Sequence, residues 1–199
     1  MINFPIPFVI KCNHGCKWQY IIKNKEEFLK NKRLFDIVKR NITGWLGQDY
    51  SFWGGFEMQY RNIKPKILFE PLMRDEIDKP CEEIEVYCFN GKPTTIFRLY
   101  ANQCQTIYNS DLLFIEDIYS STEKIILKQA DELIKKSLVL SEQLSKVFPF
   151  VRVDFMICQN RIYFEELTFT PYSGFHKFKN KKVNIDYGNL LNLEDYKYE

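Results

Sequence analysis

Two consecutive apolar runs near the end of the chain, each carrying acidic residues, most constrain how this sequence can fold. The first covers residues 151–155, Val-Arg-Val-Asp-Phe, and the second begins at Tyr163 and carries Glu165 and Glu166. Apolar residues in this pattern predict two half-buried β-strands. Carboxylates in such strands cost free energy unless a counter-charge neutralises them. A divalent cation holding nucleotide phosphates is one such counter-charge, because Mg²⁺ prefers hard oxygen ligands.

The pairing of these strands decides which acid lies beside Asp154. A two-residue turn at 159–160 would place Asp154 opposite Glu165, whereas a three-residue turn would place it opposite Glu166. A shift of one residue moves every side chain to the other face of the sheet. The pattern is equally that of a surface acid pair with Arg152 as its counter-charge, so the cation site remains one of two interpretations.

Further β-strands are predicted upstream. Asn90-Gly91 separates runs at 83–89 and 94–100, and this dipeptide between such runs is the strongest short-range signal for a hairpin. Shorter β-rich runs are predicted at 7–11, 19–22 and 66–70.

Two helices are predicted between the strands. One covers 25–40, and the other covers 120–147, with Ser120 and Glu123 as its capping box and Pro149 just beyond its end. The apolar face of the first helix is formed by Phe28, Leu29, Phe35 and Val38. Hairpins with two interposed helices predict an α+β fold with largely antiparallel sheets and packed helices.

Lys11 ends the first predicted strand, and a loop containing Gly15 follows it. A lysine there can reach a phosphate while loop N–H groups surround it, although an ordinary strand-end lysine has the same pattern. Cys12, His14 and Cys16 do not make a structural zinc site, because zinc needs four ligands and no second close pair exists. A catalytic thiol beside His14 is disfavoured, because neighbours on one loop seldom reach the geometry that nucleophile and base need.

Composition narrows the class of protein. A chain of 199 residues should form one domain, or one domain with a small lobe. The net charge of +2 argues against a nucleic-acid partner. No apolar stretch is long enough for a membrane span, and the N-terminus lacks the features of a secretory signal. Six scattered cysteines are expected to be reduced thiols, and the expected location is the cytoplasm.

Five short motifs occur in order, and together they resemble the TupA-like branch of the ATP-grasp superfamily, which is associated with teichuronopeptide, capsule and other surface-polysaccharide synthesis. These motifs lie at 8–15, 63–70, 88–93, 151–155 and 166–171. The resemblance implies a single ATP-grasp-like domain over 1–199, with a phosphate-loop lobe at 1–70 and a metal-binding lobe at 71–199. Family members usually carry an additional N-terminal region, so the N-terminal lobe is expected to be truncated here, and a partner chain could supply it.

The resemblance also implies residue roles. Lys11 and Arg152 would be catalytic, with Lys11 on the nucleotide phosphates and Arg152 near the γ-phosphate. The residues implied to bind the nucleotide are Lys11, Asn13, His14, Gly15, Lys17, Glu70, Leu72 and Glu83. The implied Mg²⁺ ligands are Asp154, Glu166 and Thr168. Ser173-Gly174 would border the acceptor site. Choosing Glu166 requires the three-residue turn or a β-bulge.

The implied activity is that of an ATP- and Mg²⁺-dependent ligase. It would form an amide between an amine and a carboxylate of a surface polysaccharide or its precursor, through an acylphosphate. Two alternatives remain open: a glycosyltransferase or sugar-modifying enzyme of the same pathway, and a non-catalytic remnant or binding subunit. One departure from the family is Glu85, which stands where many relatives carry a lysine.

Overall fold

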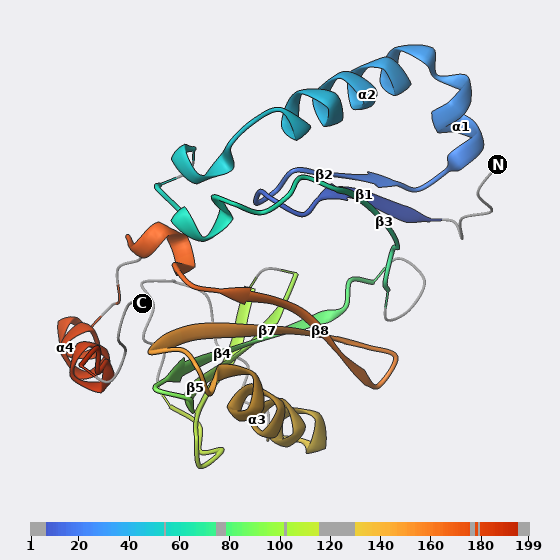
Figure 1. Cartoon of the computed structure of the whole chain (residues 1–199). Helices are drawn as coiled ribbons and strands as arrows, with labels where there is room; N and C mark the ends of the chain where they lie inside the picture. Colours follow the sequence, from blue (N-terminus) through green and yellow to red (C-terminus); the bar gives the residue numbers. More distant parts are fainter. Residues whose placement is uncertain are drawn as a thin grey trace. The chain divides into compact units, whose positions relative to one another are not determined.

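The computed structural model describes residues 7–53, 55–74, 79–101, 103–115, 130–175, 178 and 180–194. By its internal contacts the chain divides into two compact units, Met1–Met73 and Arg74–Glu199. Each unit contains an antiparallel sheet with helices packed on it, so the predicted α+β class is confirmed (Figure 1).

The first unit is built on a three-stranded antiparallel sheet in the order β2-β1-β3. Its strands are β1 (Phe8–Cys12), β2 (Gln19–Ile22) and β3 (Ile67–Pro71). Alternation in β1 buries Phe8 and Ile10 on one face and leaves Lys11 half-buried on the other. Helix α2 (Lys32–Leu46) covers the buried face, where Val38 and Ile42 pack against the strand residues (Figure 1).

Two helices replace the single one predicted over 25–40. Helix α1 (Lys25–Lys30) ends at Asn31, and α2 begins directly after it. The Asn31 side chain accepts a hydrogen bond from the N–H of Leu34 at 3.0 Å and so caps α2. Of the four residues predicted to share an apolar face, Phe28 and Val38 are buried, whereas Leu29 and Phe35 are 55% and 38% exposed. Two short 3₁₀ turns, η1 (Tyr50–Phe52) and η2 (Met58–Tyr60), lead on towards β3.

The second unit contains a five-stranded antiparallel sheet in the order β6-β5-β4-β7-β8. Its strands are β4 (Glu82–Phe89), β5 (Lys92–Tyr100), β6 (Gln103–Asn109), β7 (Phe150–Cys158) and β8 (Arg161–Thr168). The predicted hairpin between β4 and β5 is present, with positive φ at Asn90 and Gly91. A Cβ at Gly91 would lie 3.1 Å from the Cα of Lys146, so this turn also needs glycine for its close packing.

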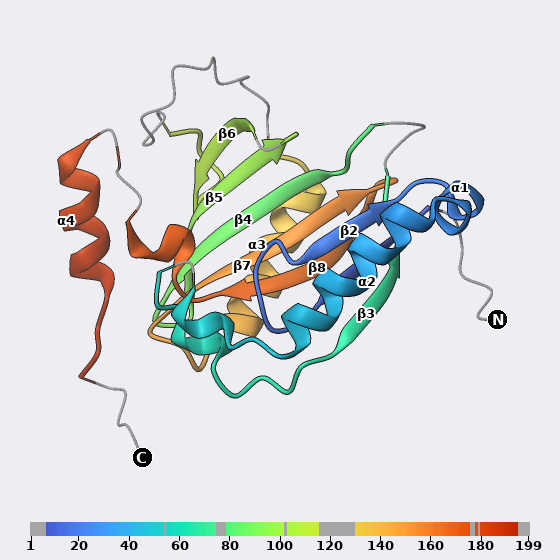
Figure 2. The ribbon, with the colours of Figure 1, turned by 90° about the horizontal axis from the view of Figure 1, so that it is seen from above.

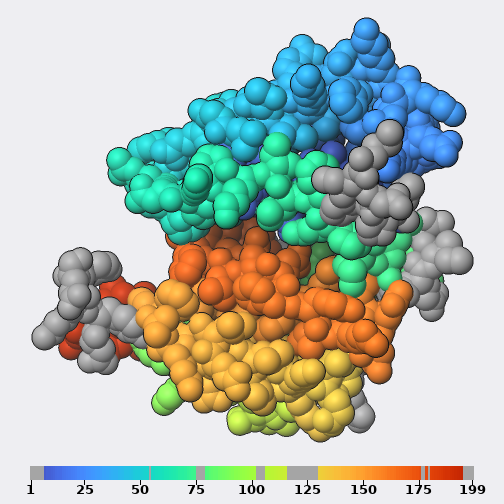
Figure 3. All heavy atoms as spheres, turned by 45° about the vertical axis from the view of Figure 1, so that its right-hand side comes forward, coloured from blue at the N-terminus to red at the C-terminus, as the bar shows by residue number. Residues whose placement is uncertain are grey.

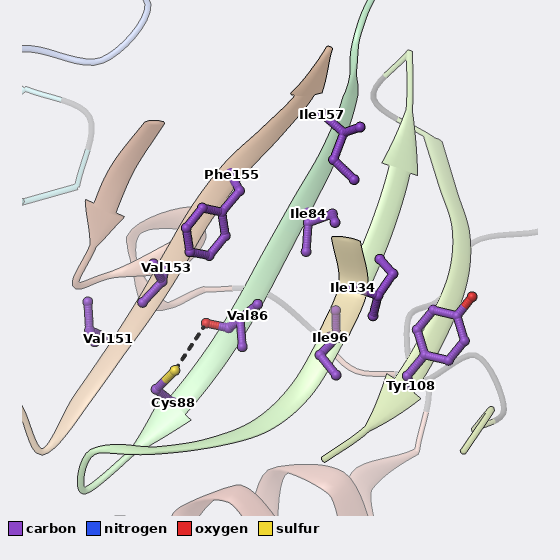
Figure 4. Packing of buried hydrophobic residues seen from close by; sticks show 10 residues of the cluster. All are labelled: Ile84, Val86, Cys88, Ile96, Tyr108, Ile134, Val151, Val153, Phe155 and Ile157. Atoms are coloured by element: carbon purple, nitrogen blue, oxygen red, sulfur yellow. Dashed lines mark hydrogen bonds between the residues drawn. The ribbon is translucent and has the colours of Figure 1, made fainter. Parts of the chain in front are cut away.

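Helix α3 (Glu132–Ser145) covers one face of this sheet (Figure 2). Figure 4 shows Ile134 of the helix beside apolar side chains from β4 to β7, and Figure 3 shows α3 and the β7–β8 hairpin as adjoining parts of one surface. The predicted continuous helix over 120–147 was wrong, because 130–131 is not helical and the side chain of Asp131 caps α3. The predicted capping box, Ser120 with Glu123, lies outside the described residues.

The opposite face of the sheet has an aromatic end and a polar end. Tyr87, Phe89 and Phe97 form the aromatic end. Helix α4 (Lys181–Leu190), which was not predicted, adds Tyr187 to it, and the Tyr187 hydroxyl lies 2.7 Å from Thr95 Oγ1. The polar end is formed by β4, β7 and β8.

The structure corrects the expectation that all cysteines are reduced thiols. Cys81 and Cys158 are joined by a disulfide, with their Cα atoms 5.0 Å apart, whereas Cys12, Cys16 and Cys88 are thiols. In the described part of the chain, no helix combines the length and the apolar character that crossing a membrane requires.

Candidate functional site

The β7–β8 hairpin brings Asp154 opposite Glu166. Its turn has two residues, Gln159 and Asn160, both with positive φ. Such a turn alone would bring Asp154 opposite Glu165, but the register shifts by one residue between Asp154 and Phe155. This β-bulge supplies the extra residue in β8. The implied pairing with Glu166 is therefore reached through a bulge and not through a three-residue turn.

Asp154 lies on the face of the sheet opposite to α3. Its neighbours in β7, Val153 and Phe155, belong to the core beneath that helix. Strand β4 alternates in the same way, so Glu83 and Glu85 share the face of Asp154, with Glu85 directly opposite it. Three carboxyl groups of two adjacent strands are thereby placed on one face.

One buried arginine connects this group. Nε and Nη2 of Arg152 donate to Oδ1 and Oδ2 of Asp154 at 2.7 Å each, which makes a bidentate ion pair. Nη1 lies 3.1 Å from Oε1 of Glu85, and Nη2 lies 3.4 Å from Oγ1 of Thr168. The side chains of Arg152, Glu85 and Asp154 are only 11%, 12% and 8% exposed, so water screens these charges weakly.

The hydroxyl of Thr168 lies between two carboxylates. Its Oγ1 is 2.9 Å from Oδ2 of Asp154 and 3.1 Å from Oε1 of Glu166. A hydroxyl has one proton and can donate to only one of them at a time. Three oxygen atoms therefore converge, and hard oxygen ligands are those that Mg²⁺ prefers. In the described ranges, no cluster of three or more His, Cys, Asp or Glu could hold a metal ion, so this set depends on the hydroxyl as its third ligand.

Negative charge exceeds positive charge here. The pKa of Glu85 is raised to about 7 and that of Asp154 to about 6, mainly by burial and also by nearby carboxylates, while Arg152 opposes the rise. Burial also raises the pKa of Glu83. Oε2 of Glu85 is buried and has no hydrogen-bond partner. A divalent cation would relieve this excess, so the residues present fit a Mg²⁺ site.

The segment after β8 carries an aromatic ring to the same place. The ring centroid of Tyr172 lies 6.0 Å from Cζ of Arg152, within the range of a cation–π contact. Tyr172, Ser173 and Gly174 have φ values of 52°, 55° and 75°. Positive φ is uncommon for residues other than glycine, and such strain concentrates at functional sites.

In the first unit, Lys11 lies on the sheet face that α2 does not cover. Its Nζ contacts Oε2 of Glu70 at 2.8 Å, joining β1 to β3. The two side chains are 33% and 44% exposed, so the pair contributes little to stability. The ammonium group is thus held by a weak, water-accessible partner that an anion could replace.

The loop after β1 is anchored by its own side chains. Asn13 donates to the carbonyl of Lys64 at 3.2 Å and accepts from the N–H of Lys66 at 2.7 Å. Nε2 of His14 contacts the carbonyl of Trp45 at 2.8 Å, and the imidazole is 2% exposed. Both side chains therefore hold the loop in place, which leaves its backbone as the part that could meet a ligand.

Glycine is needed in this loop for packing. A Cβ at Gly15 would lie 2.5 Å from the ring of Trp18, a distance that real Cβ atoms essentially never show. Lys17 is exposed, with φ of 60°. At the other end of the unit, the N–H of Leu72 donates to the carbonyl of Pro7 at 3.0 Å.

A family model described as TupA-like ATPgrasp matches residues 1–192. The chain belongs to the TupA-like ATP-grasp family. No curated protein matches this ATP-grasp chain.

Solved structures of ATP-grasp ligases resemble it at low identity. A D-alanine–D-alanine ligase from Bacillus anthracis, complexed with ATP, is 18% identical, with a TM-score of 0.41 over 83% of this chain and 39% of that one. A D-alanine–D-alanine ligase from Helicobacter pylori is 15% identical, with a TM-score of 0.43 over 96% and 50%. The ATP-grasp ligase PsnB, complexed with a minimal precursor, is 12% identical, with a TM-score of 0.42 over 94% and 48%. The chain thus spans half or less of the length of these structures.

The predicted site residues of this ATP-grasp chain fall into two groups, one in each unit. The first unit holds Lys11, Asn13, His14, Gly15, Lys17, Glu70 and Leu72. The second holds Glu83, Arg152, Asp154, Glu166 and Thr168. Within the second group, hydrogen bonds or ion pairs link Arg152, Asp154, Glu166 and Thr168.

Sequence reasoning missed two members of the polar cluster. Glu85 was noted only as a departure from the family, although its alternation with Ile84 and Val86 places it in phase with Asp154. Tyr172 was missed because nothing in the sequence marks the positive φ that turns its ring towards Arg152.

Proposed function

We propose that this chain forms part of an ATP- and Mg²⁺-dependent ligase that makes an amide on a carboxylate of a surface polysaccharide or its precursor. The observation that carries the proposal is the convergence of Asp154, Glu166 and Thr168 beside the buried Arg152. The family match over residues 1–192 supports ATP as the nucleotide. The acceptor, the amine and a partner chain supplying further ATP-grasp structure are parts of this proposal.

The reaction has two balanced steps. First, an oxygen of the acceptor carboxylate attacks the γ-phosphorus of ATP. The bond from that phosphorus to the β–γ bridging oxygen breaks, and ADP leaves. Then the amine attacks the acyl carbon of the acylphosphate, a C–N bond forms, and phosphate leaves with the electrons of the broken C–O bond. The amine nitrogen gives up its proton, which leaves a neutral amide.

Four features of the chain would position the nucleotide. Lys11 would exchange Glu70 for a phosphate oxygen, and Arg152 would donate to the γ-phosphate, because charge-assisted hydrogen bonds to phosphate are the strong ones. Mg²⁺ held by the oxygen set would neutralise charge on the phosphate oxygens. The backbone N–H groups of the loop at 13–17, including Asn13, His14, Gly15 and Lys17, would surround the phosphates.

The base and the ribose would meet the segments that follow. Glu70 and Leu72 would offer backbone groups to adenine, and Glu83 would accept from the ribose hydroxyls. For Leu72 this requires its N–H to exchange the carbonyl of Pro7 for a ring nitrogen. Ser173 and Gly174, in the strained turn after β8, would border the acceptor carboxylate.

Trapping with hydroxylamine tests the reaction. Incubation of the full chain with ATP, Mg²⁺, uronic-acid oligosaccharides and hydroxylamine should yield an acyl hydroxamate together with equal amounts of ADP and phosphate. Asp154→Asn should remove the product, whereas Glu82→Gln, which alters an acid on the opposite face of the same sheet, should retain it. Nucleotide sugars should not compete with ATP. Binding of nucleotide sugars without binding of ATP would refute the proposal in favour of a glycosyltransferase, and absence of turnover with every acceptor and partner would favour a binding subunit.

A further inference from the structure

Arg152 and Asp154 bind each other through the same atoms that their proposed ligands would need. The guanidinium donates through Nε and Nη2 to both oxygens of Asp154, and Oδ2 accepts from Thr168 as well. A cation bound to Asp154 needs at least one of these oxygens. A phosphate bound to Arg152 needs the same Nε–Nη2 edge for bidentate contact. In this arrangement the Nε–Nη2 edge of Arg152 is occupied, and three of the roughly four lone-pair sites of Asp154 already accept hydrogen bonds.

Glu85 gives Arg152 a second anchor. Its Oε1 contacts Nη1 of Arg152 at 3.1 Å, and Nη1 is the guanidinium nitrogen that Asp154 does not contact. Oε2 of Glu85 is buried without a hydrogen-bond partner, so release of Arg152 would leave a buried carboxylate wholly unpaired. The guanidinium is therefore retained at Glu85 when its other edge turns away from Asp154. The ring of Tyr172, 6.0 Å from Cζ, offers that edge an aromatic surface.

Charge explains why the two ligands need each other. A divalent cation arriving alone is attracted by the excess of carboxylates, but it competes with the guanidinium for Asp154, and the two positive charges repel. A nucleotide arriving alone brings negative phosphates to a face that carries Glu83, Glu85, Asp154 and Glu166. When both arrive, Arg152 pairs with phosphate and the cation pairs with the carboxylates, so every charge keeps a partner.

We infer that Arg152 gates the cation site. It closes the site by its bidentate pair with Asp154, and it opens the site by turning its Nε–Nη2 edge to the nucleotide phosphates while Glu85 keeps Nη1. The cation therefore raises the affinity for the nucleotide, and by thermodynamic linkage the nucleotide raises the affinity for the cation by the same factor. This inference rests on the proposed function, and it adds that the cation and the nucleotide strengthen each other's binding.

The test measures Mn²⁺ binding to the full chain by the electron paramagnetic resonance of free Mn²⁺, with and without a non-hydrolysable ATP analogue. For the wild-type chain, the analogue should tighten Mn²⁺ binding by about tenfold or more. Arg152→Met should bind Mn²⁺ alone about tenfold more tightly than the wild type, and the analogue should tighten its Mn²⁺ binding less than it does in the wild type.

Arg98→Met is the matched control. Arg98 is also buried, at 8% exposure, and it also bridges two acids: Nε and Nη2 contact Glu82 at 3.0 and 2.6 Å, and Nη1 contacts Asp131 at 3.0 Å. It lies opposite Ile84 in the sheet, on the face that α3 covers. Its loss should cost stability while leaving Mn²⁺ binding and its dependence on nucleotide at wild-type values.

Arg152→Lys is the alternative variant if Arg152→Met does not fold. A single ammonium group cannot pair with both oxygens of Asp154 as a guanidinium does. This variant should bind Mn²⁺ alone more tightly than the wild type, and at matched ionic strength Mg²⁺ should raise its Tm more than that of the wild type.

The outcomes separate the gate from the proposed function. If the Arg152 variants bind Mn²⁺ alone no more tightly than the wild type, while the analogue still tightens Mn²⁺ binding to the wild type, the gate is wrong and the ATP site stands. If the wild type binds neither the analogue nor Mn²⁺ in any combination, the proposed function fails, and the gate fails with it.

Discussion

Replacing Glu85 by Gln should stabilise the protein above neutral pH, although it removes a charged partner of Arg152. Glu85 is 9% exposed, and Arg152, with which it forms an ion pair, already forms a bidentate pair with Asp154. One carboxylate is therefore enough to neutralise the guanidinium. The second is a buried charge whose Oε2 has no hydrogen-bond partner. Glutamine keeps the size and an oxygen for Nη1, and it removes the charge.

The magnitude follows from the pKa. Burial raises the pKa of Glu85 from 4.5 to about 7, an increase of about 2.5. At about 1.4 kcal/mol for each pKa unit, the ionised form costs the folded state roughly 3 kcal/mol. The folded carboxyl holds its proton more tightly than the unfolded one, so the free energy of unfolding falls as pH rises from about 4.5 to about 7. Asp154, with its pKa raised to about 6, acts in the same direction.

The assay is urea denaturation at several pH values between 4.5 and 8, followed by far-ultraviolet circular dichroism. All three tryptophans lie in the first unit, so their fluorescence would not report on Glu85. At pH 8, Glu85→Gln should be about 1–2 kcal/mol more stable than the wild type, since the lost charge-assisted bond offsets part of the gain. At pH 4.5 the two proteins should be nearly equal, so the variant's pH profile should be flatter.

Glu82→Gln is the control for this prediction. Glu82 also lies in β4, but on the opposite face of the sheet, and its Oε2 accepts hydrogen bonds from Nε and Nη2 of Arg98. Its loss should destabilise the protein by about 1–3 kcal/mol at pH 8. If Glu85→Gln is destabilised at pH 8 as Glu82→Gln is, the reasoning that Glu85 carries excess buried charge is refuted.

Four further substitutions test other parts of the structure. Gly15→Ala should destabilise the first unit by about 1–3 kcal/mol because its Cβ meets the ring of Trp18. Gly44→Ala, whose Cβ would have nothing within 4 Å inside α2, should stabilise the unit by about 0.5–1 kcal/mol. Tryptophan fluorescence during urea denaturation measures both, and a Gly15→Ala variant no less stable than Gly44→Ala would contradict the packing argument. Asp131→Ala should cost about 1–2 kcal/mol, since it removes the cap that accepts from two N–H groups at the start of α3; unchanged stability by circular dichroism would mean that this cap is not needed. Lys11→Met should weaken binding of the ATP analogue about tenfold in calorimetry while changing stability by less than about 1 kcal/mol, and wild-type affinity would remove Lys11 from the proposed site.

The sequence predicted the fold class and the main hairpins because alternation and the Asn90-Gly91 turn are local signals. The helix boundaries were wrong where one polar side chain decides them. Asn31 ends one helix and caps the next, and Asp131 caps α3 at a point where the apolar period runs on. Helix α4 was missed because its packing depends on Tyr187 reaching Thr95, a contact between residues 92 positions apart.

The candidate site shows the same limit. Asp154 and Glu166 could be named from family motifs, but their pairing depends on a bulge between Asp154 and Phe155. A bulge reflects the packing of a whole hairpin, so the residues alone left two registers open. The ion pairs of Arg152 were equally hidden, because they depend on the strand order that sets Glu85 beside Asp154.

The most direct test of the account is calorimetric titration of the full chain with a non-hydrolysable ATP analogue, with and without Mg²⁺. The wild type should bind the analogue, and Mg²⁺ should tighten that binding. Asp154→Asn should remove the effect of Mg²⁺, while Glu82→Gln should retain it. An analogue affinity that Mg²⁺ does not change, or a Mg²⁺ effect that survives in Asp154→Asn, would contradict the assignment of a Mg²⁺–nucleotide site to this hairpin.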